Sequence, residues 1–490
     1  MDTATNMELT NEERARFLIA EANEQKGDDP IKIGIVTPIT GPGDPTAGEL
    51  ICRGANLGAQ YVREHGGIRG GRGIEFILYN DQATAVEEGM AKSSAAQMVK
   101  AALVDEIVAC MGQWQLRTTP WVVDVATRYN VPIFVENGHA FITAQKRRNV
   151  FRAYFSVADR VPYMLDFAAS QGWKRIAMLA ADTVFGQQVA DTLEEYGRTR
   201  HGMEFFRINF EQDGPREFGE ALAAIKAYEP DLFINGGVIK TNYMIIKGAT
   251  DIGLMPYTPT MVTFGFPLRS KDYWNFAGSA GLGMMWCATR YRPSWEGLTP
   301  LAHWFLDRYK ERYGDFPPDT VLTHFTDVTI IAAALNAARA VSREDLLDAL
   351  ESMEFDTWRG KIKYQHGPAH WNNVVPELGL LQYQEVGQSF DDSAIIWPPA
   401  IATKPYLPVP SQPSSEAPVS PAPAPAAEAP AVAAPVAEAA PAAAEAPSVV
   451  PAQRASADEI LTATDTPAAP AAPAAAAGPA APAQPSAPAN

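Results

Sequence analysis

IKIGIVTPITGPGDPTAGELICRGANLGAQYVREHGGIRGGRGIEFILYND, the stretch from Ile31 to Asp81, decides the fold class of this chain. It opens on a short apolar run rich in β-branched residues, as a parallel strand buried on both faces requires. Glycine and proline then break the backbone, and residues 47–65 repeat apolar side chains every three to four positions, which predicts a helix. A glycine run from Gly66 to Gly73 ends this helix, and alternation over residues 74–78 predicts a second strand. The stretch therefore predicts a complete βαβ unit.

Strand and helix signals continue to alternate outward from this unit to about Leu254. The first series of alternating strands and helices ends with a strand at 132–135. The pattern crosses over at Phe151 to Phe155 and restarts with a helix at 160–171. Two such series, each long enough for its own parallel sheet, predict an α/β protein with two doubly wound, Rossmann-like lobes and a ligand site between them.

Composition predicts how the chain is divided. Residues 1–30 form an N-terminal extension in which Thr10 and Glu13 make a capping box, so a short amphipathic helix is expected there. We expect lobe 1 at 31–153, completed by about 318–353, and lobe 2 at 154–290 with parts of 354–390. The Pro/Ala-rich segment 407–490 cannot bury enough apolar area to fold, so a disordered tail is expected.

Charge and cysteine usage exclude several classes of protein. The formal net charge of −17 argues against a nucleic-acid partner, because binding nucleic acid requires clustered Lys and Arg.

The chain contains no run of about 20 apolar residues, so no membrane span is predicted. The N-terminus has no secretory leader pattern, so the chain as written is expected in the cytoplasm. Cys52, Cys110 and Cys287 are far apart and are expected to be buried free thiols.

No cofactor or metal site is predicted. His366 and His370 have a spacing that would suit a helical metal face, but Gly367 and Pro368 between them prevent a regular helix. In a doubly wound sheet, ligands bind at the carboxyl ends of the strands, so residues 37–47 and 80–84 are site candidates on topology alone.

Several segments together carry a family resemblance: IKIGIVTPITGP, GGIRGGRGIEFILYNDQAT, IVACMGQ, NVPIFVENG, FRAYFS, WKRIAMLAADTVFGQQ and PDLFINGG. In order and spacing, the chain from about Ile31 to Tyr383 resembles the type I periplasmic binding proteins. Within that family it is most similar to the branched-chain amino acid (Leu/Ile/Val) binding proteins of ABC importers. The resemblance implies two Rossmann-like lobes joined by three crossovers, with a ligand trapped by hinge closure. It also implies a periplasmic location, in contrast to the cytoplasmic one expected from the chain as written.

The resemblance also implies the site residues. In lobe 1 they follow the third and fourth strands, and in lobe 2 they follow the first and third: Gln113, Trp114, Gln115, Glu136, Asn137, Gly138, His139, Asp182, Phe185, Gly237 and Val238. The acidic residue that holds a ligand ammonium in the family would fall near Thr263 or Phe264, and neither is acidic. A buried ammonium without a counter-charge is costly, so this departure argues against a standard α-amino acid unless Glu136 supplies the charge.

Several of these residues could have a structural role instead of a role in ligand binding. Trp114 is either a flat wall of the site or an aromatic packed under the lobe. His139 is either a ligand group or a helix cap, and Asp182 with Thr183 could cap the helix that begins at Val184. Arg152 and Arg290 could hold an anion or act as structural clamps to a carboxylate or carbonyl.

The leading functional hypothesis is a non-enzymatic solute-binding protein. It would capture an amino acid, an amide or a small aromatic acid and deliver it to an ABC permease. The alternative is a cytosolic, amide-responsive sensor of the same fold that binds a regulatory protein. An amide-hydrolysing enzyme with Glu136 and His139 as acid and base is disfavoured, because no nucleophile or metal is apparent beside them.

Overall fold

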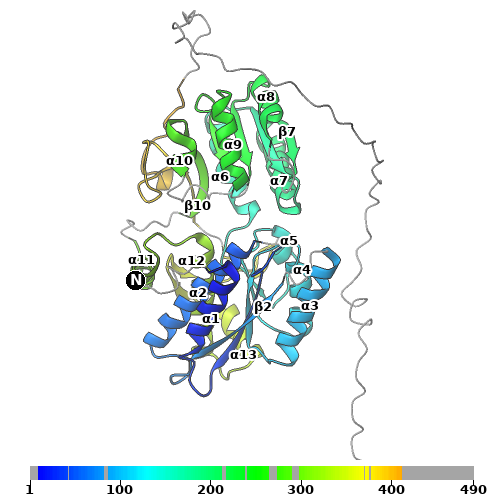
Figure 1. Ribbon diagram of the computed structural model, residues 1–490, viewed down its shortest axis with the longest axis vertical. Coiled ribbons are helices and arrows are strands. Elements are labelled where there is room, and N and C mark those ends of the chain that lie inside the picture. Colours follow the sequence, from blue (N-terminus) through cyan, green and yellow to red (C-terminus); the bar gives the residue numbers. More distant parts are fainter. Residues whose placement is uncertain are drawn as a thin grey trace, which may run out of the picture. The chain divides into compact units, whose positions relative to one another are not determined.

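The computed structural model describes residues 9–41, 44–81, 87–211, 217–237, 240–263, 273–289, 297–368, 370–374 and 377–410. Val238, Phe264, Arg290 and the tail beyond residue 410 lie outside these described residues. The chain forms an α/β fold of two lobes, each built on its own sheet (Figure 1).

Lobe 1 contains a fully parallel sheet with the strand order β2-β1-β3-β4-β5. Its strands are β1 (Ile31–Thr37), β2 (Ile74–Asn80), β3 (Ala109–Gln113), β4 (Ile133–Val135) and β5 (Val150–Phe151). The order reverses between β1 and β3, so the carboxyl ends of these two strands form a topological switch point, where ligands bind in open α/β sheets.

Helices cover both faces of the lobe 1 sheet (Figure 1). One face packs on α1 (Asn11–Asn23), α2 (Pro45–Glu64), α12 (Asp319–Ala337) and α13 (Arg343–Ser352). The other face packs on α3 (Glu87–Leu103) and α4 (Thr119–Arg128). Beside them, α11 (Pro300–Tyr313) packs on α2, and the short helix α5 (Ala140–Ala144) follows β4. Because both faces are covered, the strands are apolar throughout, as the opening sequence predicts.

Lobe 2 repeats the same parallel order and extends it. Its sheet runs β14-β13-β10-β9-β8-β6-β7, and β13 and β14 are antiparallel to their neighbours. The strands are β6 (Arg175–Ala181), β7 (Glu204–Phe210), β8 (Leu232–Gly236), β9 (Thr260–Val262), β10 (Met285–Thr289), β13 (Leu378–Gln382) and β14 (Ala394–Trp397). A hairpin of β11 (Phe355–Thr357) and β12 (Gly360–Ile362) stands apart. The second switch point lies between β6 and β8.

The helices of lobe 2 also form two layers. One layer is α6 (Val157–Ser170) and α7 (Val184–His201); the other is α8 (Gly219–Ala227), α9 (Lys240–Asp251) and α10 (Tyr273–Ala277). After β14 the chain stays on this lobe to the last described residues. The amide of Leu407 donates to Gln382 Oε1 at 2.8 Å, and Gln382 Nε2 donates back to the carbonyl of Leu407 at 2.9 Å.

Two segments that pass between the lobes are hydrogen-bonded to each other. The amide of Arg152 donates to the carbonyl of Asn372 at 2.9 Å, and the amide of Val374 donates to the carbonyl of Arg152 at 3.1 Å. The Arg152 side chain is fully buried and donates to the carbonyl of His139 and to Thr143 Oγ1. Arg152 therefore has the structural role of a clamp to a carbonyl.

The N-terminal helix is an integral part of lobe 1. The capping box of Thr10 and Glu13 is formed, as the sequence predicts. At the other end of α1, Asn23 Nδ2 donates to the carbonyl of Phe76 at 2.9 Å, and Asn23 Oδ1 accepts from the amide of Phe76 at 2.8 Å. The Asn23 side chain thereby occupies part of the open edge of β2, which would otherwise offer unpaired backbone groups.

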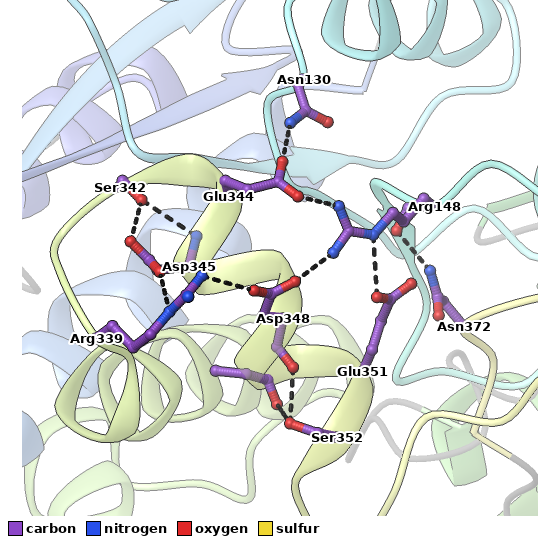
Figure 2. Close-up of polar contacts among 11 residues, drawn as sticks. Asn130, Arg148, Arg339, Ser342, Glu344, Asp345, Asp348, Glu351, Ser352 and Asn372 are labelled. Carbon is purple, nitrogen blue, oxygen red and sulfur yellow. Dashed lines mark hydrogen bonds and ion pairs between the residues drawn. The ribbon is translucent and has the colours of Figure 1, made fainter. Parts of the chain in front are cut away.

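An ion-pair network holds α13 against the loop that precedes β5 (Figure 2). Arg148 contacts three carboxylates on one face of α13: Glu344, Asp348 at 2.6 Å and Glu351 at 3.0 Å. The carbonyl of Arg148 accepts from Asn372 Nδ2 at 2.7 Å. One residue thus joins the last helix of lobe 1 to a crossover segment.

We expect Arg148→Ala to lower the free energy of unfolding by about 1 kcal/mol, since the side chain is partly exposed and such pairs are screened by solvent. Urea denaturation at low and at high salt measures this, and the loss should shrink at high salt. Arg16→Ala, which removes a single exposed pair with Glu12, is the control and should have almost no effect. A loss for Arg148→Ala that is independent of salt would contradict the electrostatic origin.

Helix α12 is the one helix, within the described ranges, that is long and apolar enough to cross a membrane by length and composition. However, 78% of its most apolar window is buried inside the protein, which makes it a core helix. Its closest packing partner is α2, where Gly54 and Gly58 face it without side chains.

The three thiols are buried and free, as predicted, and burial raises the pKa of each. The predicted helices at 47–65 and 160–171 and the predicted strands at 74–78 and 132–135 correspond to α2, α6, β2 and β4 to within a few residues, whereas Phe151 belongs to the short strand β5 rather than to the crossover itself. Strands β9, β10 and β14 have no counterpart among the predicted elements.

Candidate functional site

The lobe 1 switch point is buried and has polar atoms without partners. Thr37 ends β1 and Gln113 ends β3, and both are almost fully buried. Gln113 Nε2 donates to the carbonyl of Val36 at 2.8 Å, whereas Gln113 Oε1 and Thr37 Oγ1 have no hydrogen-bond partner in the described part of the chain. Gly112, the residue before Gln113 in β3, adopts φ +95, a conformation that favours glycine, where the register between β3 and β4 shifts.

Glu136, which follows β4, is hydrogen-bonded to side chains of α12. Thr320 Oγ1 donates to Glu136 Oε1 at 2.9 Å, and His324 Nε2 lies 3.2 Å from Glu136 Oε2. The other ring nitrogen of His324, Nδ1, lies 3.1 Å from Asp327 Oδ2. All three ionisable side chains are buried, so this is a charged triad inside lobe 1.

The triad is built around a cationic imidazole. Burial by itself lowers the pKa of His324, but the hydrogen bonds to Asp327 and Glu136 and the charges of both carboxylates outweigh it and raise the pKa to about 9. His324 is therefore protonated at neutral pH and donates from both nitrogens. Burial raises the pKa of Asp327, and His324 counteracts this. The negative charge of Glu136 is consequently matched by a cation of the protein itself.

A dependence of stability on pH follows from this shift. The folded pKa of His324 is about 9, above the 6.5 of an ordinary histidine, so its stabilisation is complete below pH 6.5 and is lost as the pH rises through 9. The difference corresponds to about 3 kcal/mol. We expect the difference in unfolding free energy between the wild type and His324→Asn to narrow over this range in urea titrations. A difference that stays constant from neutral pH to beyond pH 9 would refute the prediction.

The rest of the loop after β4 is tied to its surroundings residue by residue. Asn137 Nδ2 donates to the carbonyl of Trp114 at 3.0 Å. The carbonyl of Gly138 accepts from the amide of Val157, at the start of α6, at 2.9 Å. His139 Nδ1 accepts from the amide of Phe141 at 3.2 Å and caps α5. Burial and the charge of Arg152 lower the pKa of His139 to about 4, so its ring is neutral at neutral pH, as an acceptor must be.

The loop after β3 has a structural role as well. Trp114 is partly buried and packs against the hydrophobic core of lobe 1, which is the second of the two readings of this residue. The carbonyl of Gln115 accepts from the amide of Thr119 at 3.0 Å, at the start of α4. These contacts fix the loop and leave its role toward a ligand as a prediction.

In lobe 2, the described site residues lie at the carboxyl ends of β6 and β8. Asp182 is exposed, and Thr183 rather than Asp182 caps α7 by accepting from the amide of Gly186 at 3.0 Å. Gly237 is buried and its amide donates to Asn235 Oδ1 at 2.9 Å. A Cβ on Gly237 would lie 2.7 Å from the amide nitrogen of Asn242, so this position requires glycine.

The two lobes meet at Gly138. A Cβ built on Gly138 would lie 3.7 Å from Phe185 Cε2, in the first turn of α7, and 3.7 Å from Arg160 Nη2, on α6. Two predicted site residues from different lobes, Gly138 and Phe185, are therefore neighbours. The family's acidic position near Thr263 is instead beside a cation, since Arg160 Nη1 donates to the carbonyl of Thr263 at 2.5 Å.

Sequence reasoning missed His324, Asp327, Thr320 and Arg160. A usable signal existed for the first two: a histidine and an aspartate three residues apart share one face of a helix, and α12 is otherwise strongly apolar. Arg160 carried no such signal, because it appears only as the start of a predicted helix.

No group of three or more His, Cys, Asp or Glu residues that could hold a metal ion occurs among the described residues. The ring of His366 stacks on that of Trp371, with centroids 4.6 Å apart, and its Nε2 lies 2.8 Å from Asn372 Oδ1.

Comparison with known proteins agrees with this architecture. The sequence model described as periplasmic binding protein matches residues 30–376, which is most of the folded part. The chain belongs to the periplasmic binding protein family. The matched region of this periplasmic binding protein begins at residue 30, after α1.

Individual relatives are distant. The chain is 22% identical over 340 residues to the leucine-, isoleucine-, valine-, threonine-, and alanine-binding protein of Pseudomonas aeruginosa, covering 69% of this chain and 86% of the relative. The branched-chain amino acid transporter substrate-binding protein of Streptococcus pneumoniae, in complex with isoleucine, superposes with a TM-score of 0.62 at 16% identity, covering 76% of this chain and 100% of that chain. A solute-binding protein of an ABC transporter from R. palustris, in complex with benzoate, gives 0.61 at 20% identity, covering 78% and 98%.

Proposed function

We propose that this periplasmic binding protein captures a small polar or amphipathic molecule between its lobes for ABC-type uptake. The observation that carries the proposal is the close approach of Gly138, which follows β4 of lobe 1, to Phe185, which follows the first strand of lobe 2. Loops at the carboxyl ends of two separate sheets thus face each other, which is where ligands of such sheets bind. The family's relatives in complex with isoleucine and with benzoate support a small organic ligand.

The paired crossovers support closure around that ligand. Arg152 and Asn372 belong to different crossovers and are joined by a backbone hydrogen bond, so the lobes can rotate about one short ribbon. The non-enzymatic hypothesis is favoured for the same site, because Glu136 is engaged by His324 and Thr320, while His139 caps α5. This pairing gives no support to Glu136 and His139 acting together as acid and base.

The test is a thermal-shift screen of the full chain against amino acids, amides and small aliphatic and aromatic acids. A ligand that binds only the folded state at 100 times its Kd stabilises that state by about 2.7 kcal/mol, which such a screen detects. The proposal fails if no compound of any class shifts the melting temperature. Cell fractionation then separates the two outputs: the importer subunit is expected outside the cytoplasm with a permease as partner, and the sensor inside it with a regulatory protein as partner.

A further inference from the structure

Arg160 is a buried cation that has no anionic partner among the residues that the structure describes. Arg160 is only 4% exposed. No carboxylate of the described residues lies within ion-pair distance of its guanidinium. Within the described ranges, its guanidinium makes one hydrogen bond, from Nη1 to the carbonyl of Thr263. Taking a guanidinium out of water costs several kcal/mol unless a counter-charge or hydrogen bonds compensate. The ring of Phe155, whose centroid lies 4.9 Å from Arg160 Cζ, offsets part of this cost.

The unused donors of Arg160 lie on one edge of the guanidinium. Nε is buried and has no hydrogen-bond partner, and no hydrogen bond from Nη2 connects it to the described residues. The Nε–H and one N–H of Nη2 point in the same direction along this edge. That pair of donors is the fork that binds a carboxylate with two parallel hydrogen bonds.

This edge lies where the predicted site residues of the two lobes meet. Arg160 Nη2 and Phe185 Cε2 are each 3.7 Å from the position of a Cβ on Gly138. Because residue 138 is glycine, no side chain of lobe 1 fills this position. The guanidinium lies over the ring of Phe155, and the ring of Phe185 approaches the same position at Gly138, a setting for an anionic group attached to an apolar body.

The described site residues include two acids, the exposed Asp182 and the buried Glu136. A zwitterionic amino acid also needs an anion for its ammonium, and Glu136 is the buried acid of the loop after β4. Both of its oxygens are already engaged by Thr320 and by the cationic His324. A ligand with a carboxylate and without an ammonium matches these charges.

We propose that Arg160 binds the carboxylate of the solute, and that the solute is a small organic acid with an apolar body rather than a zwitterionic α-amino acid. This inference rests on the proposed function and names the ligand class of the same site. Access to the guanidinium edge comes with opening of the lobes, and closure brings Phe185 over the bound acid.

The experiment measures how the full chain distinguishes ligands that differ only in charge. Benzoate is compared with benzamide, and 4-methylpentanoate with leucine, which carries an added ammonium. We expect the wild type to prefer benzoate to benzamide and 4-methylpentanoate to leucine in calorimetric titrations. Arg160→Gln should weaken carboxylate binding by about 10- to 100-fold and abolish the preference for benzoate, since a hydrogen-bonded charge contributes about 1.5–3 kcal/mol. Arg160→Lys should retain part of it.

Arg343→Gln is the matched control. Arg343 also donates to backbone carbonyls, those of Ile107, Tyr129 and Ala102, but does so at the amino end of β3, away from the site. This variant should lose stability and keep the charge preference. The inference is overturned if the wild type prefers benzamide or leucine, or if Arg160→Gln weakens benzoate and benzamide equally, although the solute-binding function would stand. Failure of every compound to bind the wild type would overturn both.

Discussion

Replacement of His324 by asparagine is expected to lower the free energy of unfolding by about 3–5 kcal/mol at neutral pH, the cost of leaving a buried charge without its partner. His324 is completely buried and is the cation between Glu136 and Asp327, at 3.2 and 3.1 Å. Asparagine fills less space and carries no charge, so two buried carboxylates would face each other without compensation. One of them would have to take up a proton or draw in water.

Urea denaturation at neutral pH measures this loss. His303→Asn changes an exposed histidine of α11 and should change stability by less than about 0.5 kcal/mol. The triple variant Glu136→Gln, His324→Asn, Asp327→Asn removes all three charges and should recover most of the lost stability. A triple variant as unstable as His324→Asn would show that lost packing, and not the unpaired charges, causes the effect.

Replacement of Gly54 by valine is expected to cost about 3 kcal/mol, the upper part of the usual range for overpacking a core. A Cβ at this position of α2 would lie 2.6 Å from the carbonyl oxygen of Val321 and 2.9 Å from the amide nitrogen of Phe325. Both are backbone atoms of α12, so relief requires the two helices to separate. The better helix propensity of valine returns only a few tenths of a kcal/mol.

Gly219→Val is the control, because a Cβ on Gly219 meets no atom within 4 Å. It should leave the urea midpoint nearly unchanged. Stability of Gly54→Val equal to that of the wild type would mean that α2 and α12 are not held at this distance in solution.

His324→Asn and Gly54→Val affect the same series of contacts, which connects α2 to the candidate ligand site. A Cβ on Gly54 would also lie 3.1 Å from the Cβ of His324. The close approach of α2 therefore sets the position of α12, α12 places His324, and His324 orients the carboxylate of Glu136 at the end of β4. A substitution at Gly54 is accordingly expected to disturb the loop that carries Asn137 and Gly138. These two residues are far from Gly54 in the sequence and belong to a different predicted element.

Local patterns explain how much of the fold was predictable. The β-branched run of β1, the glycine turn before β2 and the capping box of Thr10 and Glu13 each act through neighbours a few residues away, so they can be read from the chain. Strands β9 and β10 were not predicted because the segment after Thr258 lacks a clear period. They are strands because the sheet of lobe 2 pairs with them.

The candidate site was predictable only as a set of loops. Gly138 and Phe185 follow from the resemblance and from strand-end topology, and the structure brings them together. The partner of Glu136 was not predictable, since His324 is 188 positions away in the chain. Arg160 was not recognised for a similar reason: its isolation from every carboxylate of the described chain is a property of packing, and no local pattern encodes it.

By itself, the sequence determined the α/β class, the two repeated lobes, the helix caps and the three buried thiols, because these depend on periodicity, capping and hydrophobicity over short distances. Only the tertiary structure decided which charges are paired. It placed His324 between two carboxylates, and it left the buried Arg160 Nε, near Gly138 and Phe185, without a hydrogen-bond partner among the described residues. The physical reason is that the electrostatic energy of a buried group depends on distances of a few ångströms between residues far apart in the chain.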